Sequence, residues 1–194
     1  MVTENYSKVT VMGEVQEEPR CIVKYGIEQI FETVITYKRT SGKTDTFVIN
    51  YSAGTGVELH KGMFIHISEG TLRSTRYQGI TKIYIKADVI TVLDAEPEVY
   101  ANEVELKGIL VREPKLRKSY ADDRTDISDM VIRVPRNQGK VSYIPVVAWN
   151  NNARLVLECT VGGTLTISGR LQSHTTGKGY LMTEVTATTF DFTA

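Results

Sequence analysis

The sequence predicts an all-β protein made of two similar five-stranded barrels, each with a short helix between its third and fourth strands. Three observations lead to this prediction: an internal repeat, apolar residues that alternate with polar ones, and turn-forming residues between the alternating segments. The 194-residue chain has 41% apolar and 24% charged residues, a composition that supports packed cores. We therefore expect a folded chain of two small domains.

The repeat is clearest where each half begins. Val9–Val15 precedes a Glu-Pro-Arg sequence, and Val104–Leu110 precedes a Glu-Pro-Lys sequence. Ile65–Ser68 later matches Leu165–Ser168, so ordered similarities extend over most of each half. Such self-similarity indicates two copies of one fold.

An acidic segment around Pro97 separates the two copies. Proline and clustered charge in this position are typical of a linker between folded segments. The sequence therefore predicts one domain at residues 1–96 and another at residues 97–194.

Each copy begins with strict alternation, as a strand with one buried face requires. Gly13 and Gly108 interrupt these strands at buried positions, where glycine permits the bend that a small barrel needs. Second strands are expected at residues 30–39 and 126–136, and polar turns and third strands follow.

A helix is expected after the third strand of the second half. Asn150-Asn151-Asn152 offers N-cap residues, and the apolar face would contain Ala153, Val156 and Leu157. Two more strands complete each half. Three strands, a short helix and two strands within about 100 residues is the order of an OB-fold.

The second half resembles the bacterial-type single-stranded DNA-binding proteins. The resemblance is carried, in order, by residues 102–110, Arg133–Arg136, Tyr143–Trp149 and Gly163–Leu171. It implies an OB-fold, binding of single-stranded DNA with little sequence preference, work in replication, recombination or repair, and an assembly of four OB-folds. A homodimer would supply four if each chain has two. The first half matches only through its likeness to the second.

The chain departs from this family in two places. Family members commonly carry Gly-Lys after the aromatic residue of the third strand, where this chain has Asn150-Asn151. They also commonly end in a flexible tail with an acidic tip, whereas this sequence stops at Phe190–Ala194. Recruitment of other proteins through such a tail is therefore not expected, which fits a phage, plasmid or otherwise specialised member.

Sequence-tolerant binding requires flat aromatic faces for bases and cations for phosphates. Tyr143 and Trp149 share the face of the third strand that points away from the core, and aromatic residues at both positions stack on bases in the resembling family. In the first half, Phe47 and Tyr51 are placed on the corresponding face, with Tyr51 matching Trp149. The alternative for each ring is packing in a core or interface.

The other candidates are cations and rings that border the expected groove. The loop between strands four and five contributes His174, Lys178 and Tyr180 in the second half, and Arg73, Arg76 and Tyr77 in the first. The first loop of the second half contributes Arg112, Lys115, Arg117, Lys118 and Tyr120, and neighbouring strands contribute Arg133, Arg136 and Arg170. The alternatives are an ordinary polar hairpin and a solvated loop.

We expect no catalytic site, metal site or cofactor. Ser41–Thr44 resembles the end of a phosphate-binding loop, but Tyr37 stands where that motif requires glycine. The histidines lack metal-ligand spacing, and neither cysteine has a nearby histidine. The absence of a secretory signal or long apolar run predicts a cytoplasmic protein with no membrane or small-molecule partner.

Two other functions compete with single-stranded DNA binding. One or both OB-folds could act as a protein-interaction adaptor in a replication or phage complex, because the net charge is zero and the first half is acidic and lacks tryptophan. RNA is the third option, since nothing in the sequence reports recognition of the 2′-hydroxyl.

Overall fold

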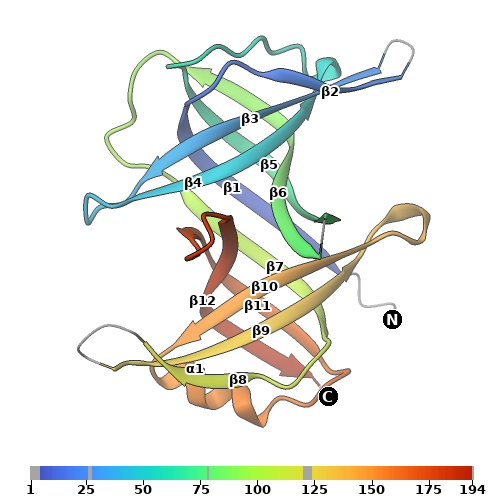
Figure 1. The fold of residues 1–194 in the computed structure, drawn as a ribbon, viewed down its shortest axis with the longest axis vertical. Helices are drawn as coiled ribbons and strands as arrows, with labels where there is room; N and C mark the ends of the chain where they lie inside the picture. The colour runs from blue at the N-terminus through green and yellow to red at the C-terminus, as the bar shows by residue number, and fades with distance from the viewer. Residues whose placement is uncertain (1–4, 26–27, 78, 120–123, 194) are drawn as a thin grey trace. The chain divides into compact units, whose positions relative to one another are not determined.

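The structure is a computed structural model that describes residues 5–25, 28–77, 79–119 and 124–193. In these described ranges, both repeats have six strands in the same order (Figure 1). The strands of the first repeat are β1 (Tyr6–Val15), β2 (Arg20–Tyr25), β3 (Glu28–Lys38), β4 (Thr44–Ser52), β5 (Phe64–Tyr77) and β6 (Ile80–Leu93). Those of the second are β7 (Asn102–Leu110), β8 (Lys115–Lys118), β9 (Asp126–Pro135), β10 (Val141–Trp149), β11 (Thr164–Thr175) and β12 (Leu181–Thr193).

Each repeat closes into a barrel because its first strand pairs with two partners. β1 pairs with β5 along most of its length and with β3 at its end, and β7 pairs in the same way with β11 and β9. The third long strand then runs parallel to the last one, β4 beside β6 and β10 beside β12. This is the topology of the OB-fold, so the fold class expected from the sequence is confirmed. The short strands β2 and β8 are additions that pair with β3 and β9.

Glycine is required where the first strand of each barrel changes partner. A Cβ atom on Gly108 would lie 2.6 Å from the carbonyl oxygen of Arg133, and one on Gly13 would lie 3.0 Å from that of Thr36. A side chain at either position would therefore push β9 or β3 away. These contacts explain why glycine stands at both positions, and the bend expected there stays a prediction.

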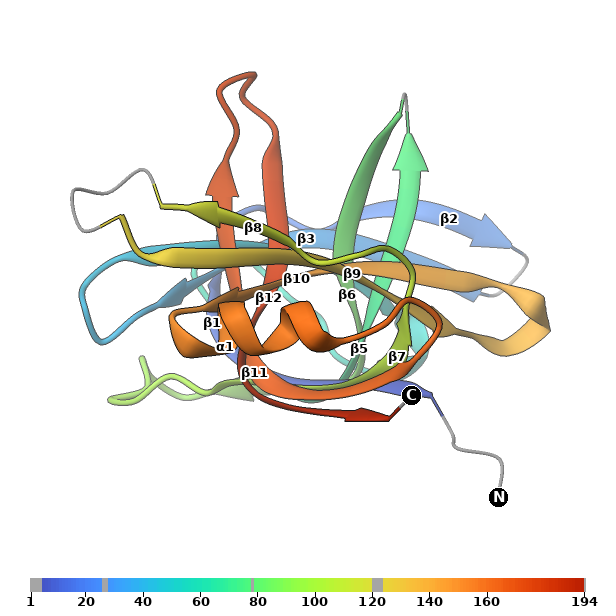
Figure 2. The same cartoon turned by 90° about the horizontal axis from the view of Figure 1, so that it is seen from below.

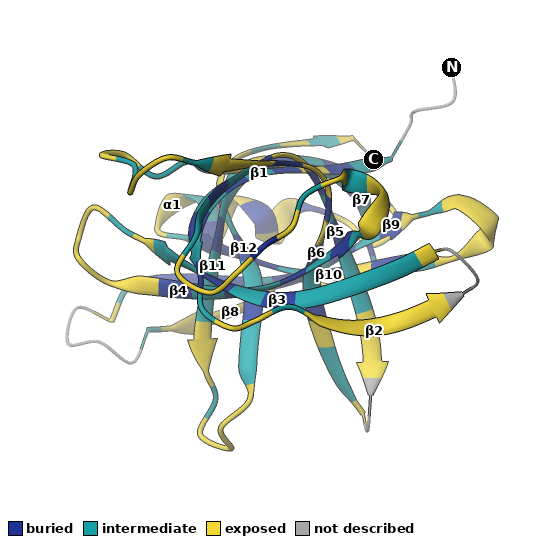
Figure 3. Cartoon of the chain, turned by 90° about the horizontal axis from the view of Figure 1, so that it is seen from above, coloured by how far each residue is buried: buried dark blue, intermediate teal, exposed yellow. Residues whose placement is uncertain are grey.

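The core of each barrel is formed by the inward residues of the long strands, which appear dark blue in Figure 3. The residues with no exposed surface include Val11, Ile35, Ile49 and Ile65 in the first barrel and Leu106, Ile132, Ile144 and Ile167 in the second. Nearly all are β-branched or leucine, which suits a pleated, tightly packed surface.

The predicted helix of the second repeat is present but short. α1 (Asn151–Leu155) continues as the 3₁₀ turn η3 (Val156–Glu158). Ala153 and Val156 are fully buried as expected, but Leu157 is 42% exposed, so its place on the apolar face was wrong. The tighter winding of the 3₁₀ turn rotates Leu157 away from the core. The first repeat has only a 3₁₀ turn, η1 (Ala53–Thr55), at this point, and a third such turn, η2 (Asn137–Gly139), connects β9 and β10.

The segment between the repeats contacts the first barrel. Lys38 Nζ lies 3.2 Å from Glu96 Oε1, which also accepts a 3.1 Å hydrogen bond from the Tyr100 hydroxyl. The Tyr100 ring meets the Tyr37 ring edge-on at 6.0 Å. Burial and the Glu96 carboxylate raise the pKa of Tyr100 to about 12. The segment is thus anchored, and the boundary at residues 96 and 97 stays a prediction.

Contacts group the chain into two compact units that do not follow the repeat. One contains Lys8–Glu103 together with Gln172–Thr183, and the other contains Val104–Leu171 with the rest of β12. The outer part of the β11–β12 hairpin therefore packs with the first barrel. Within the described residues, no helix is long and apolar enough to cross a membrane.

Candidate nucleic-acid interface

Three strands of the second barrel, β8, β9 and β10, present a shared outer surface. Arg133 on β9 lies directly opposite Tyr143 on β10, and Ile127 lies opposite Trp149. Arg117 on β8 lies opposite Ile127, so that one row crosses all three strands. Directly paired residues point to the same face of a sheet. We use the name β10 face for the set Lys115, Arg117, Arg133, Tyr143 and Trp149.

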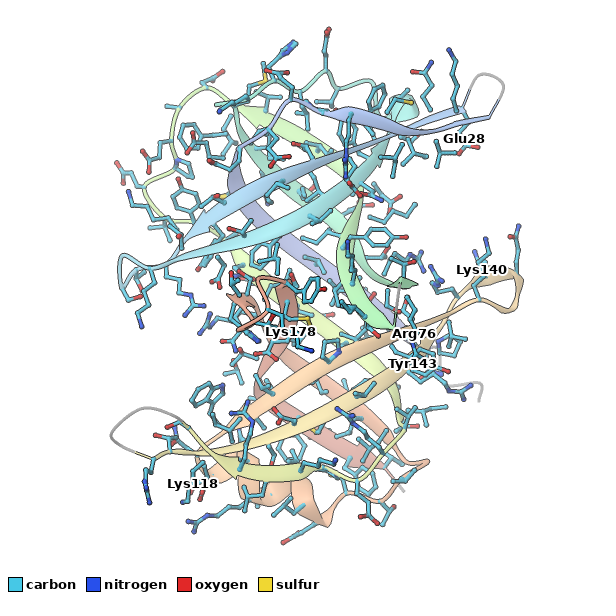
Figure 4. The ribbon with its side chains drawn as sticks, viewed as in Figure 1. Glu28, Arg76, Lys118, Lys140, Tyr143 and Lys178 are labelled. Atoms are coloured by element: carbon cyan, nitrogen blue, oxygen red, sulfur yellow. The ribbon has the colours of Figure 1, made fainter. Side chains whose placement is uncertain are left out.

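The two rings of the β10 face are accessible from solvent. The Tyr143 side chain is 45% exposed and is labelled on β10 in Figure 4, and Trp149 is half-buried. They are six positions apart along the strand, or roughly 20 Å. Both lie on the outer face, as predicted from the alternation of β10. A face of this length has room for several unstacked bases between the rings.

The cations of the β10 face differ in how they are paired. Arg117 donates two hydrogen bonds to Asp129, at 2.7 Å from Nε and 3.0 Å from Nη2. This pair fixes the guanidinium on the outer side of β8 and partly neutralises it. Lys115 is exposed and lies opposite the same aspartate, and it forms no ion pair among the described residues. Lys115 is therefore the more available charge for a phosphate.

Lys118 lies on the opposite face of β8 from Lys115 and Arg117, although the sequence grouped the three together. Its ammonium lies 2.5 Å from Asp126, a carboxylate that is only 8% exposed and also accepts a 2.7 Å hydrogen bond from Arg154 on α1. Hydrogen bonds from Lys118 and Arg154 lower the pKa of Asp126. The cluster ties β8, β9 and α1 together, so Lys118, which is labelled on β8 in Figure 4, has a structural partner.

Two further arginines of the second barrel, Arg136 and Arg170, are partly enclosed. Arg136 donates a 3.1 Å hydrogen bond to the Val141 carbonyl, and its Nε is buried without a partner in the described structure. One terminal nitrogen of Arg170 is buried in the same way. Arg112 is exposed between β7 and β8. Tyr120 lies outside the described residues.

The candidates in the β11–β12 hairpin are at its outer end. His174 and Lys178 are exposed, and the Tyr180 side chain is 44% exposed. The turn is fixed by hydrogen bonds from Thr176 N to Tyr180 O at 2.9 Å and from Gly179 N to Thr176 O at 2.8 Å. These three side chains belong to the compact unit that contains the first barrel.

The prediction that Phe47 and Tyr51 lie on the outer face of the first barrel was wrong. The Phe47 side chain has no exposed surface and Tyr51 is 4% exposed, because both point into the barrel. Tyr51 stacks on Phe31 at 5.6 Å, and burial raises the pKa of Tyr51. Ile49 pairs with Ile85 as Val146 pairs with Val185, so Tyr51 corresponds to the core residue Ala148. Neither ring is available for stacking on a base.

The first barrel instead has an aromatic residue on β6 that the sequence prediction missed. Tyr84 lies opposite Arg73 in the long β5–β6 hairpin, which extends beyond its barrel (Figure 2). Tyr84, Lys82 and Arg20 line a hollow of about 190 Å³. Arg20 is paired there with Glu32. The alternation of β6 is the signal that could have revealed Tyr84, because Ile83 and Ile85 on either side of it are buried. Arg76 is exposed near the hairpin end, and the Tyr77 side chain lies outside the described part.

The fold and the β10 face define a class: a tandem OB-fold protein with rings and cations together on one outer face. Comparison with known families matched residues 101–193 to the Single-strand binding protein family. This confirms the family expected for the second half. No curated protein matched the chain.

Solved structures with the same arrangement extend the likeness to both repeats. A variant of the single-stranded DNA binding protein from Thermus aquaticus is 21% identical, with a TM-score of 0.78 over 100% of this chain and 97% of that chain. The wild-type protein of that organism is also 21% identical, with a TM-score of 0.77 over 99% and 95%. At this level of identity, the likeness establishes the shared tandem fold. The family match itself is limited to residues 101–193.

Proposed function

We propose that the protein binds single-stranded DNA with little sequence preference, and that the β10 face of the second barrel carries most of the binding. The observation that carries this proposal is the row in which Trp149, Ile127 and Arg117 cross three strands, with Tyr143 and Arg133 paired further along the same face. Bases can stack on the two rings while phosphates meet Lys115 and the arginines. The family match over the same residues supports this assignment.

Phosphate contacts would make the binding depend on salt. The net charge of the chain is zero, so the attraction must come from the local arrangement of cations rather than from the whole molecule. Protection or organisation of transient single strands in replication, recombination or repair follows as the cellular role.

The proposal is tested by fluorescence anisotropy of a labelled oligo-dT. Tyr143→Ala is expected to weaken binding roughly fivefold to a hundredfold, the range for loss of one stacked base. Lys115→Ala is expected to weaken it less and to reduce the salt slope by about one. Lys61→Ala is the matched control, because Lys61 is an exposed lysine of the first barrel outside the proposed interface. Equal affinity of wild type and Tyr143→Ala would rule out the β10 face as the main site.

A homodimer with four OB-folds is the proposed assembly. Sedimentation of the DNA-free protein should give twice the chain mass of 21.7 kDa. Parallel titrations with oligo-dT and oligo-U distinguish DNA from RNA as the preferred strand.

The first barrel is a candidate protein-interaction module, as an alternative to DNA binding. The outer positions of β4 are Thr46, Val48, Asn50 and Ser52, so this strand presents no ring where the second barrel has Tyr143 and Trp149. If Tyr84→Ala leaves DNA affinity unchanged, an adaptor role for the first barrel is favoured.

A further inference from the structure

A buried carboxylate of the first repeat holds the β11–β12 hairpin of the second. Both belong to the compact unit of Lys8–Glu103 and Gln172–Thr183. The backbone N–H of Ser173 donates a 2.7 Å hydrogen bond to Asp45 Oδ1. The Ser173 hydroxyl accepts a 2.8 Å hydrogen bond from the backbone N–H of Thr46. Two adjacent residues of β4 thus engage both the backbone and the side chain of one residue of β11.

The burial of Asp45 is not explained by the core of the first barrel. Its side chain has no exposed surface and shares the inward face of β4 with Phe47 and Ile49. An ionised carboxylate in such a place is costly unless it is paired and hydrogen-bonded. Arg39 pairs with it through two hydrogen bonds of 2.5 Å, which raise the pKa of Arg39. The Ser173 N–H supplies a further donor to the same carboxylate.

At this position of the third long strand, the buried carboxylate is specific to the first repeat. The pairing of β4 with β6 and of β10 with β12 aligns Ile49 with Val146, which places Ser142 where the first repeat has Asp45. Ser142 is buried and uncharged, so the core position tolerates a small neutral residue. The carboxylate at residue 45 is therefore not a requirement of the barrel itself.

We infer that Asp45 is a positioning residue for the β11–β12 hairpin, and that it presents Lys178 and Tyr180 to single-stranded DNA in one fixed arrangement. This inference rests on the proposed function. Lys178 and Tyr180 follow Ser173 in the hairpin, and the Thr176–Tyr180 turn is itself held by hydrogen bonds. Fixing the base of the hairpin therefore fixes the approach of both side chains. A hairpin ordered in advance binds a strand more tightly because less ordering remains to be done on binding.

The hairpin is tested first without DNA, by hydrogen exchange of the 172–183 segment in the full chain. Asp45→Ala and Ser173→Ala should each speed exchange of this segment, with the larger effect for Asp45→Ala, because it removes the acceptor of the Ser173 N–H. Ser173→Thr keeps the hydroxyl and should restore wild-type exchange. Ser168→Ala is the matched control, since Ser168 is an exposed serine of the same strand, β11, outside this segment. If Asp45→Ala does not fold, the Ser173→Ala and Ser173→Thr pair decides. Unchanged exchange in the folded variants would overturn the inference.

The effect on binding is tested by a double-mutant cycle. The joint change of Lys178→Ala and Tyr180→Ala should weaken oligo-dT binding roughly fivefold or more in the wild type. It should weaken binding less than about twofold in the Asp45→Ala or Ser173→Ala background, where the hairpin is already mispositioned. An equal loss in both backgrounds would overturn the inference.

The two proposals fail in different ways. If Tyr143→Ala weakens binding but the Lys178 and Tyr180 change does not, the hairpin inference is wrong and the β10 face stands. If oligo-dT does not bind at all, the proposed function fails, and the exchange experiment alone decides whether Asp45 holds the hairpin.

Discussion

Asn150, the residue that follows Trp149, adopts a backbone conformation that favours glycine. Its φ of 55° and ψ of −127° lie in a region that residues with a Cβ rarely occupy. Its side chain forms no capping hydrogen bond to α1 that would offset the strain. The family resemblance points to glycine at this position, and the structure gives the physical reason.

Asn150→Gly is expected to raise the free energy of unfolding by about 1 kcal/mol, because it relieves this strain. Urea denaturation measures the difference. Asn151→Gly is the control, because Asn151 is the first residue of α1 and glycine there should not stabilise the protein. A less stable Asn150→Gly variant would contradict the account of the strain.

Asp126 makes stability depend on pH. Its pKa is lowered in the folded protein by Lys118 and Arg154, so its contribution is present above the pKa of the unfolded chain. That contribution is lost as the pH falls through the folded pKa. The free energy of unfolding of the wild type should therefore fall more steeply below about pH 4 than that of Asp126→Asn. Parallel slopes in urea denaturation at several pH values would refute a charged cluster at this site.

The outward face of a candidate residue could be predicted from the alternation of its own strand. Tyr143 and Trp149 lie on the outer face as expected. Phe47 and Tyr51 do not, because the two third strands were compared one residue out of register, and a shift of one residue reverses the face of every side chain. The role of Asp45 could not be predicted from the sequence. It depends on hydrogen bonds with Arg39 and Ser173, and Ser173 is far away in the sequence.

The space beside the glycine of the first strand differs between the two barrels. A Cβ atom on Gly108 would lie 2.6 Å from both the Arg133 oxygen and an Ile132 methyl carbon, whereas the nearest contact for Gly13 is 3.0 Å. Gly108→Ala should therefore destabilise the protein by about 1–3 kcal/mol, and Gly13→Ala by less. Gly177→Ala, where a Cβ would meet nothing within 4 Å, is the control. Urea denaturation that ranks Gly13→Ala as the more damaging change would contradict this account.

The strands were predictable because their alternation and turn residues are strong local signals. The helix was less so: α1 and η3 together cover the expected segment, but the change from α-helical to 3₁₀ winding moved Leu157 out of the core. The residues of β8 were expected to lie in a loop, and no strand was predicted at β2. Their residues are mostly exposed edge positions, which carry little periodicity for a sequence pattern to detect.

At the scale of the whole chain, the two copies share the barrel fold but differ in the side chains on its outer face. The second copy has Tyr143 and Trp149 on β10, whereas the first has small or aliphatic residues on the outer side of β4 and a ring on β6 instead. The grouping of the 172–183 hairpin with the first barrel could not be read from the repeat, because it depends on contacts between residues far apart in sequence. It gives the first barrel a role in presenting part of the second.

The most direct test of the β10 face is a fluorescence titration of the wild-type protein with oligo-dT at low and moderate salt. Trp149 is the only tryptophan, so the signal reports on this face alone. Stacking of a base on Trp149 should quench its emission, and the midpoint should move to higher oligonucleotide concentration as salt is added. Binding of oligo-dT, seen by anisotropy, with no change in Trp149 emission would contradict the claim that the strand crosses this face.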